Sequence, residues 1–183
     1  MQANEPGMSN NEQIILENIF SRKSVRHFIH EAVSKERLEL LMKAGMAAPS
    51  ANNKQPWSFI GITDRTIMDY LADGLPYAKM LAQAGGAIVV CGDMNKIDPN
   101  KKDFWIQDCS AATENILLAA EGVGLGAVWT ALYPYKERYS VVQGKLSLPD
   151  HIIPLCIIPI GQPTGVDLSK EKFKSENIHW NKW

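Results

Sequence analysis

The sequence predicts an α+β domain. The predicted helices outnumber the four predicted strands, and the two kinds of element do not alternate strictly along the chain. That order favours an α+β domain over a doubly wound parallel sheet. The chain has 183 residues, which fits one domain at roughly 150 residues per domain. Its hydrophobic content of 45% is ordinary for a globular protein.

The stretch from Asp108 to Trp129 is the element around which the rest of the chain is expected to pack. After Asp108 its first part is apolar on almost every side, and only Glu114 and Glu121 carry charge there. A helix that is apolar all round has to be buried, in a core or against another chain. We do not expect a membrane span, because a span needs about 20 mostly apolar residues. The glycines between positions 122 and 126 end this helix and permit positive φ angles.

The other helices are predicted from apolar residues at helical spacing. In the clearest case, apolar positions from Leu38 to Gly45 follow the pattern i, i+3, i+4, i+7, and Ser34 precedes them as a candidate N-cap. Asp64 is a candidate N-cap for a second helix, and Pro134 fits the first turn of a third. The predicted helices cover residues 12–20, 34–46, 64–72, 76–84, 104–122 and 134–143.

The strands are predicted from apolar runs that lack helical spacing. The run 87–91 is apolar throughout, which indicates a strand buried on both faces. The run 152–160 contains Pro154 and Pro159. Because proline cannot donate a hydrogen bond to a ladder, we expect parts of this strand to be edge or bulged. The predicted strands cover residues 57–63, 87–91, 127–131 and 152–160.

Charge and cysteine content argue against several classes of function. The formal net charge is −1 and no block of five basic residues occurs, so nothing indicates a nucleic-acid partner. The three cysteines lie in apolar surroundings without a Cys-x-x-Cys pair, as expected of reduced core thiols. No group of histidine, cysteine and acidic residues has the spacing that is typical of metal ligands. Residues 1–10 form a polar, flexible lead-in without an apolar signal core, so we expect a cytoplasmic protein whose single domain covers residues 11–183.

A basic loop after the first helix is a candidate anion site. Arg22, Lys23, Ser24 and Arg26 place three cations and a hydroxyl within five residues. In an extended chain Arg22, Ser24 and Arg26 can point the same way, and guanidinium forks match phosphate oxygens. The alternative interpretation is a solvated basic turn.

A second polar loop contains Ser50, Asn53 and Gln55. Their amides and hydroxyl suit a polar ligand edge, although such side chains also bond their own backbone in turns. The two loops flank the helix 34–46, so they could lie near one another or, along a straight helix, about 18 Å apart. A ligand that is anionic at one end and amide-like at the other would span that gap, and flavin mononucleotide (FMN) has that shape.

The C-terminal tail, residues 161–183, has little periodicity. Trp180 and Trp183 are large apolar groups at the end of a polar stretch, and an isolated chain would leave them in water. Docking on a partner subunit would bury them. The alternative is docking on the same subunit.

Five segments carry a resemblance to a known family, and they occur in the family's order. Each is modest alone, but together they are specific, and the chain resembles the FMN-dependent nitroreductases. The resemblance implies an α+β fold with a central mixed sheet surrounded by helices. It also implies an intertwined homodimer with exchanged C-terminal tails and two FMN sites at the subunit interface. The segments are Ser21–Phe28, Ala48–Trp57, Gln107–Trp129, Ile158–Pro163 and Asn177–Trp180.

The resemblance also assigns roles to residues of this chain. Arg22 and Ser24 would hold the FMN phosphate, with Lys172 or Lys174 completing that site. Arg26 would face the ribityl chain and pyrimidine edge, where a cation stabilises the negative charge of reduced flavin. A backbone N–H near Ala131 and Leu132 would meet flavin N5. The implied cofactor-binding set is Arg22, Lys23, Ser24, Arg26, Ser50, Asn53, Gln55, Thr130, Ala131, Leu132 and Lys172.

The implied reaction is a ping-pong oxidoreduction. NADH or NADPH passes hydride to flavin N5 and leaves, and then a nitroaromatic, quinone or similar small oxidant takes the electrons. Protein groups position the flavin and set its electronics, so no protein acid or base is expected. No Gly-x-Gly-x-x-Gly motif follows a strand, which argues against a separate dinucleotide domain. The alternative is an FMN-binding carrier or sensor without physiological turnover.

Overall fold

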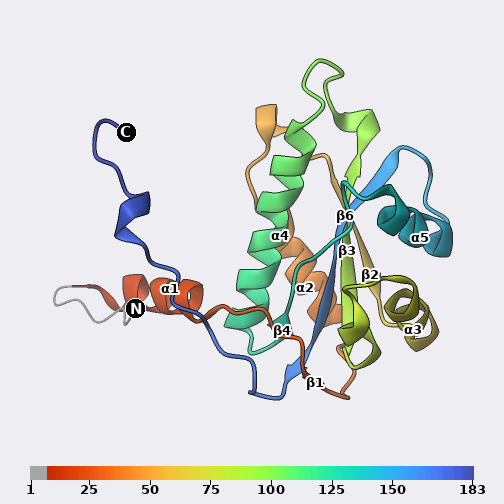
Figure 1. Ribbon diagram of the computed structural model, residues 1–183, viewed down its shortest axis with the longest axis horizontal. Helices are drawn as coiled ribbons and strands as arrows, with labels where there is room; N and C mark the ends of the chain where they lie inside the picture. Colours follow the sequence, from red (N-terminus) through yellow and green to blue (C-terminus); the bar gives the residue numbers. More distant parts are fainter. Residues whose placement is uncertain (1–7) are drawn as a thin grey trace.

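A computed structural model describes residues 8–183, and its centre is a six-stranded sheet (Figure 1). The longest strand, β6, pairs with β3 along one edge and with β1, β4 and β5 in turn along the other. β2 pairs with the far edge of β3. The strands are β1 (Phe28–Ile29), β2 (Trp57–Ile62), β3 (Gly86–Asp93), β4 (Gly126–Ala127), β5 (Thr130–Ala131) and β6 (Ile152–Pro163).

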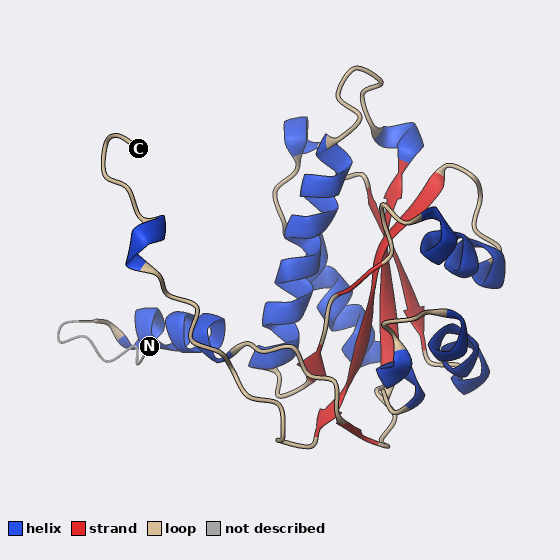
Figure 2. Cartoon of the chain, viewed as in Figure 1, coloured by secondary structure: helices blue, strands red, loops and turns tan. Residues whose placement is uncertain are grey.

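The helices cover both faces of this sheet (Figure 2). α2 and α4 lie on one face, and α3 and α5 lie on the other. The α-helices are α1 (Asn10–Ser21), α2 (Lys35–Met46), α3 (Arg65–Gly74), α4 (Phe104–Gly122) and α5 (Lys136–Leu146); short 3-10 turns are η1 (Ala51–Asn53), η2 (Lys79–Ala82), η3 (Met94–Lys96) and η4 (Ser175–Asn177).

The α+β class is confirmed, but the sheet of the described chain is not mixed. Every strand pair within residues 8–183 is antiparallel. The reason is clear between β2 and β3, where Ile62 pairs with Ala87. α3 carries the chain away from the sheet and the segment through η2 packs against α3 on the way back. The chain therefore re-enters the sheet at the end where it left.

The expectation that parts of the proline-containing strand are edge or bulged is confirmed by a bulge, although the strand as a whole is central. β6 is central, and its residues from Pro154 to Gly161 are buried. Pro154 lies at a register shift in the β3 pairing, between the partners of Val90 and Cys91. Pro159 lies opposite the break between β4 and β5. Both prolines thus occupy positions where the ladder is already interrupted, so the missing N–H costs little.

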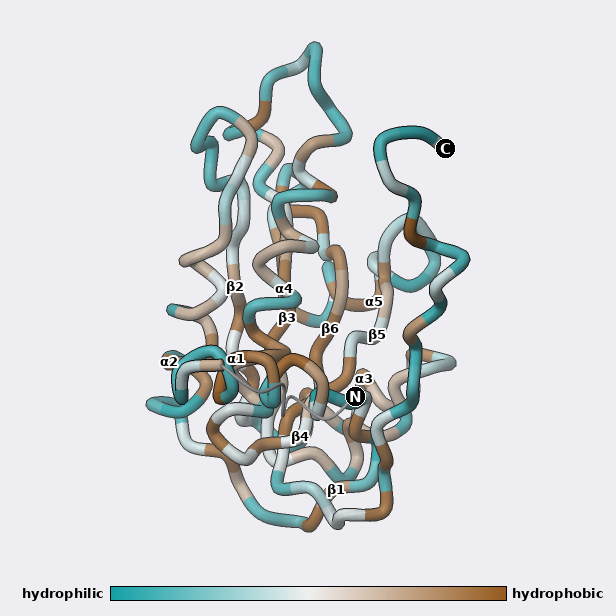
Figure 3. The backbone as a smooth tube through the Cα atoms, turned by 90° about the vertical axis from the view of Figure 1, so that its left-hand side faces the viewer, coloured by the Kyte–Doolittle hydropathy of each residue, from teal (hydrophilic) through white to brown (hydrophobic). Residues whose placement is uncertain are grey.

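Alternation along the strands explains how one sheet supplies two cores. Ile88 and Val90 face α2 and α4, whereas Val89 and Cys91 face α3 and α5. All four side chains have no exposed surface, as predicted for the run 87–91. Figure 3 shows this hydrophobic interior between the more hydrophilic outer segments.

Two predicted helix starts are confirmed, and two other local predictions are not. The Ser34 side chain accepts the Arg37 N–H at the start of α2, and Asp64 accepts two N–H groups at the start of α3. The predicted strand 127–131 is instead two short strands, because Val128 and Trp129 leave the ladder. α5 begins at Lys136, so Pro134 lies in the preceding turn rather than in the first helical turn.

The two ends of the chain project from this compact body (Figure 1). The predicted lead-in, 1–10, lies outside the described residues up to position 7; Ser9 then caps α1 with a capping box. No residue of α1 is buried, and Ile14, Ile15 and Ile19 are exposed. The tail after β6 is exposed too, including Trp180 and Trp183. Among residues 8–183, no helix is long and apolar enough to span a membrane.

Candidate functional site

The basic loop, residues 22–26, runs between α1 and β1 and is anchored on the C-terminal half of α4. Nε of Arg22 lies 3.6 Å from Oε1 of Glu114, and Nζ of Lys23 lies 2.9 Å from Oε1 of Glu121. Val25 is buried, and its N–H donates to a carbonyl of β4 at 3.0 Å. The loop is therefore fixed in place by its backbone and two ion pairs, which is more order than a merely solvated turn requires.

A hollow of about 640 Å³ opens between the basic loop and the start of the tail, and we call it the anion hollow. Five cationic side chains line it, against the single carboxylate of Asp167. Such an excess of positive charge suits a phosphate. The structure thereby brings together one group of the predicted cofactor-binding residues, namely Arg22, Lys23, Ser24, Arg26 and Lys172; Lys170, which was not predicted, lines the same hollow.

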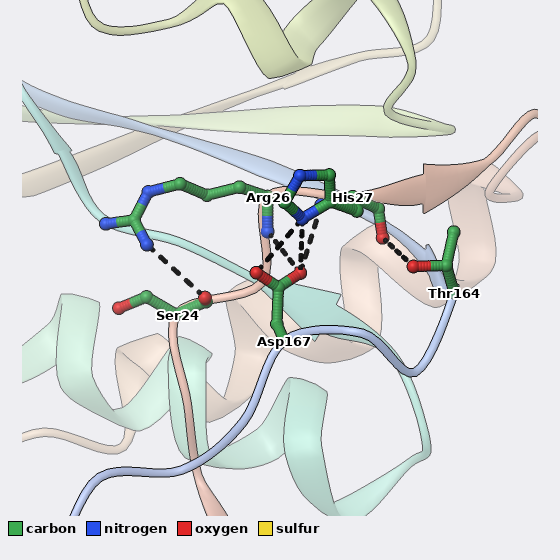
Figure 4. A network of polar contacts seen from close by, with 5 residues as sticks. All are labelled: Ser24, Arg26, His27, Thr164 and Asp167. Carbon is green, nitrogen blue, oxygen red and sulfur yellow. Dashed lines mark hydrogen bonds and ion pairs between the residues drawn. The ribbon is translucent and has the colours of Figure 1, made fainter.

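Asp167 ties the tail to the basic loop (Figure 4). Its Oδ2 accepts the backbone N–H groups of Arg26 at 3.0 Å and His27 at 3.1 Å, and its Oδ1 lies 3.1 Å from Nδ1 of His27. Thr164 adds a hydrogen bond from its N–H to the His27 carbonyl at 3.1 Å. Burial by itself raises the pKa of the Asp167 carboxyl, but the hydrogen bonds from Arg26 and His27 outweigh it and hold that pKa below its usual value.

Replacement of Asp167 by Asn is expected to lower the free energy of unfolding at pH 7 by about 1–3 kcal/mol, because a charged acceptor of two N–H groups becomes neutral. The folded pKa lies below the unfolded one, so the carboxylate's contribution is complete above about pH 5 and is lost as the pH falls through the folded pKa. Urea unfolding of both proteins should therefore show a difference in the free energy of unfolding that is present at pH 5 and narrows below about pH 4.

The matched control is Asp69→Asn, which removes a carboxylate from an exposed ion pair with Arg65 on α3. That change should lower the free energy of unfolding by less than about 1 kcal/mol at any of these pH values. A stability gap for Asp167→Asn that stayed constant to the lowest pH would contradict the assigned charge effect.

A second hollow, of about 480 Å³, is also lined by Arg26, and we call it the strand hollow. Thr130 and Ala131 of β5 line it, as does Arg26, so Arg26 joins the two hollows. Leu132 is different, because it is buried and its N–H already donates to the Leu155 carbonyl at 3.0 Å. The other lining residues, which sequence reasoning missed, are Pro76, Tyr77, Lys79, Met80, Val128, Trp129 and Arg138.

The second polar loop does not join these hollows within one chain. The Ala51 N–H donates to Asp108 near the start of α4, whereas the basic loop is anchored at Glu121 near its end. Thirteen helical residues separate Asp108 from Glu121, which corresponds to about 20 Å, and six separate Asp108 from Glu114, the partner of Arg22, which corresponds to about 9 Å. Ser50 and Asn53 both accept hydrogen bonds from Gln55, so the loop is also bonded to itself, as the alternative interpretation predicted.

Comparison with known proteins identifies the class to which this fold and site belong. The model of the nitroreductase family matches residues 19–75 and 72–162. A candidate NADH dehydrogenase/NAD(P)H nitroreductase from Archaeoglobus fulgidus is 39% identical over 171 residues, covering 92% of this chain and 98% of the relative. The chain therefore belongs to the nitroreductase family, which confirms the resemblance inferred from its motifs.

Solved structures agree with this assignment. A candidate NADH dehydrogenase/NAD(P)H nitroreductase from Parabacteroides distasonis shares 50% identity with a TM-score of 0.87, covering 92% of this chain and 98% of that one. A candidate nitroreductase from Desulfovibrio desulfuricans, solved in complex with FMN, shares 31% identity with a TM-score of 0.78, covering 92% of this chain and 97% of that one.

Proposed function

We propose that this chain is an FMN-dependent NAD(P)H oxidoreductase that reduces nitroaromatics, quinones or similar small oxidants by a ping-pong reaction. The observation that carries the proposal is that Arg26 lines both the anion hollow and the strand hollow. A ligand with an anionic phosphate at one end and a flat ring at the other requires two such neighbouring spaces. The names of the relatives from A. fulgidus and D. desulfuricans support the same reductant and cofactor.

The residues present fit FMN at both ends. In the anion hollow, Arg22 and Ser24 would hold the phosphate, with Lys23 and Lys172 adding positive charge. The strand hollow offers the exposed edge of Ala131 and the apolar surface of neighbouring side chains to the ring. FMN, when bound, supplies the hydride acceptor and two-electron carrier that the side chains themselves lack.

Arg26 has the most specific task in this arrangement. It lies where phosphate site and ring site meet, and no carboxylate forms an ion pair with it among residues 8–183. Its positive charge is therefore available to favour the electron-rich, reduced form of a bound flavin. The only hydrogen bond that its guanidinium makes in the described chain is to the Ser24 carbonyl, at 3.5 Å.

The remote second loop indicates that the complete site is built from two subunits. Ser50, Asn53 and Gln55 line neither hollow of this chain, so if they contact the same flavin as Arg22, we infer that they come from a second copy of the chain. The exposed apolar faces of α1 and the tail would supply the contact between the copies. We therefore propose a homodimer with exchanged tails and two shared sites.

An absorbance spectrum of the purified protein tests the function directly. We expect a flavin spectrum that bleaches on anaerobic addition of NADPH or NADH and returns when a nitroaromatic or quinone is added. A yellow protein that does not bleach would favour the carrier or sensor alternative. A colourless protein that also fails to bind added FMN would refute the proposal.

A further inference from the structure

Arg138 is a cation at the rim of the strand hollow that the proposed flavin site does not use. It lies in the first turn of α5, and the centre of its guanidinium is 3.8 Å from the Tyr135 ring centroid and 5.0 Å from the Tyr77 ring centroid. Tyr77 comes from the loop after α3, so two separate elements hold the guanidinium. Both tyrosines are exposed, which leaves this group of three side chains open to a ligand.

The charged side chains that line the strand hollow are all positive among the described residues. Arg26, Lys79 and Arg138 line it, and no Asp or Glu does so among its described residues. The other two cations contact only neutral carbonyls, since Nζ of Lys79 donates to the Asp73 carbonyl at 3.2 Å and Arg26 donates to Ser24. None of the three forms an ion pair with a carboxylate within residues 8–183. A negatively charged ligand would relieve their mutual repulsion.

The position of Arg138 separates its task from phosphate binding. The anion hollow is lined by Arg22 and Lys172 but not by Arg138. Arg138 instead shares the strand hollow with Ala131, beside which the ring of the flavin would lie. An anion bound by Arg138 therefore belongs to the molecule that meets the ring.

We propose that Arg138 is a specificity-determining residue that binds a carboxylate on the small oxidised substrate. A guanidinium accepts a carboxylate through two parallel N–H···O bonds, and the two tyrosine rings orient it for that contact. The inference rests on the proposed function, because it assumes that oxidants reach the strand hollow. The favoured oxidants are then small aromatic acids rather than neutral molecules of the same shape.

The test compares two probes of similar shape, 4-nitrobenzoate and the neutral 4-nitrobenzamide. The measured quantity is the ratio of their kcat/KM values at saturating NADPH, in the wild type, Arg138→Gln and Arg138→Lys. We expect the wild type to prefer the carboxylate and Arg138→Gln to lower the ratio by roughly 10- to 100-fold, as for loss of a charge-assisted pair. Arg138→Lys should recover part of the preference, because it keeps the charge but not the fork.

Lys145→Gln is the matched control. Lys145 also lies on α5 and over a tyrosine ring, at 4.5 Å from the Tyr70 centroid, but it does not line the strand hollow. Its replacement should leave the ratio within about twofold of the wild type. An equal loss with both probes in Arg138→Gln would overturn the proposal, because it would indicate a structural role.

The same anion chemistry is present in the phosphates of NADPH, so the half-reactions are measured separately by stopped flow. A loss confined to flavin reduction by NADPH and NADH, with the probe ratio unchanged, would overturn the assignment to the oxidant. Failure of the proposed function has a different signature, since a wild-type protein without bound flavin would turn over neither probe.

Discussion

Arg22→Ala is expected to release most of the FMN on dialysis and to weaken FMN binding by about 10- to 150-fold. Arg22 is the residue of the anion hollow that the family resemblance places on the phosphate, and a hydrogen bond between charged groups contributes about 1.5–3 kcal/mol. Its present partner, Glu114, is half exposed, so the free energy of unfolding of the apoprotein should change by less than about 1 kcal/mol. Titration of apoprotein with FMN, followed by quenching of flavin fluorescence, measures the affinity.

Arg37→Ala provides the control for the loss of one guanidinium. Arg37 lies exposed on α2 and lines neither hollow. Its removal lowers the net charge of the protein by the same amount and should leave the FMN affinity within about twofold. Equal FMN affinities for Arg22→Ala and the wild type would remove Arg22 from the phosphate site.

Deletion of residues 177–183 is expected to convert a dimer into a monomer and to lower FMN occupancy in parallel. The deleted segment contains Ile178, Trp180 and Trp183, all exposed in the single chain. Truncation of a tryptophan at the centre of an interface typically weakens the binding free energy by about 2 kcal/mol or more. A symmetric dimer would lose four such tryptophans. Light scattering coupled to size-exclusion chromatography measures the mass, and the ratio of flavin to protein absorbance measures occupancy.

The full-length variant Lys182→Gln separates burial of the tryptophans from the charge of the tail. It should remain dimeric and fully loaded with FMN. A stable, fully loaded dimer after the deletion would show that the tail docks elsewhere, and α1 would then have to supply the interface alone.

The sequence by itself determined the features that depend on neighbours along the chain. Helix starts at Ser34 and Asp64 follow from side chains that accept N–H groups two or three residues later. The burial of residues 87–91 and of one face of α4 follows from runs too apolar to face water. The basic loop was recognisable for the same reason, since its cations and hydroxyl lie within five consecutive residues.

Tertiary structure alone decided which distant residues meet. Pro154 and Pro159 predicted a strand that is edge or bulged in parts, but only the tertiary structure places β6 at the centre of the sheet, with the bulge and the gap between β4 and β5 at the two prolines. Asp167 contacts His27, which is 140 residues away, and the sequence around Asp167 does not predict that contact. Arg138 likewise joins Tyr77 only through the packing of α5 beside α3. Local spacing encodes helices and loops, whereas the path of the chain through the sheet determines which of them form one site.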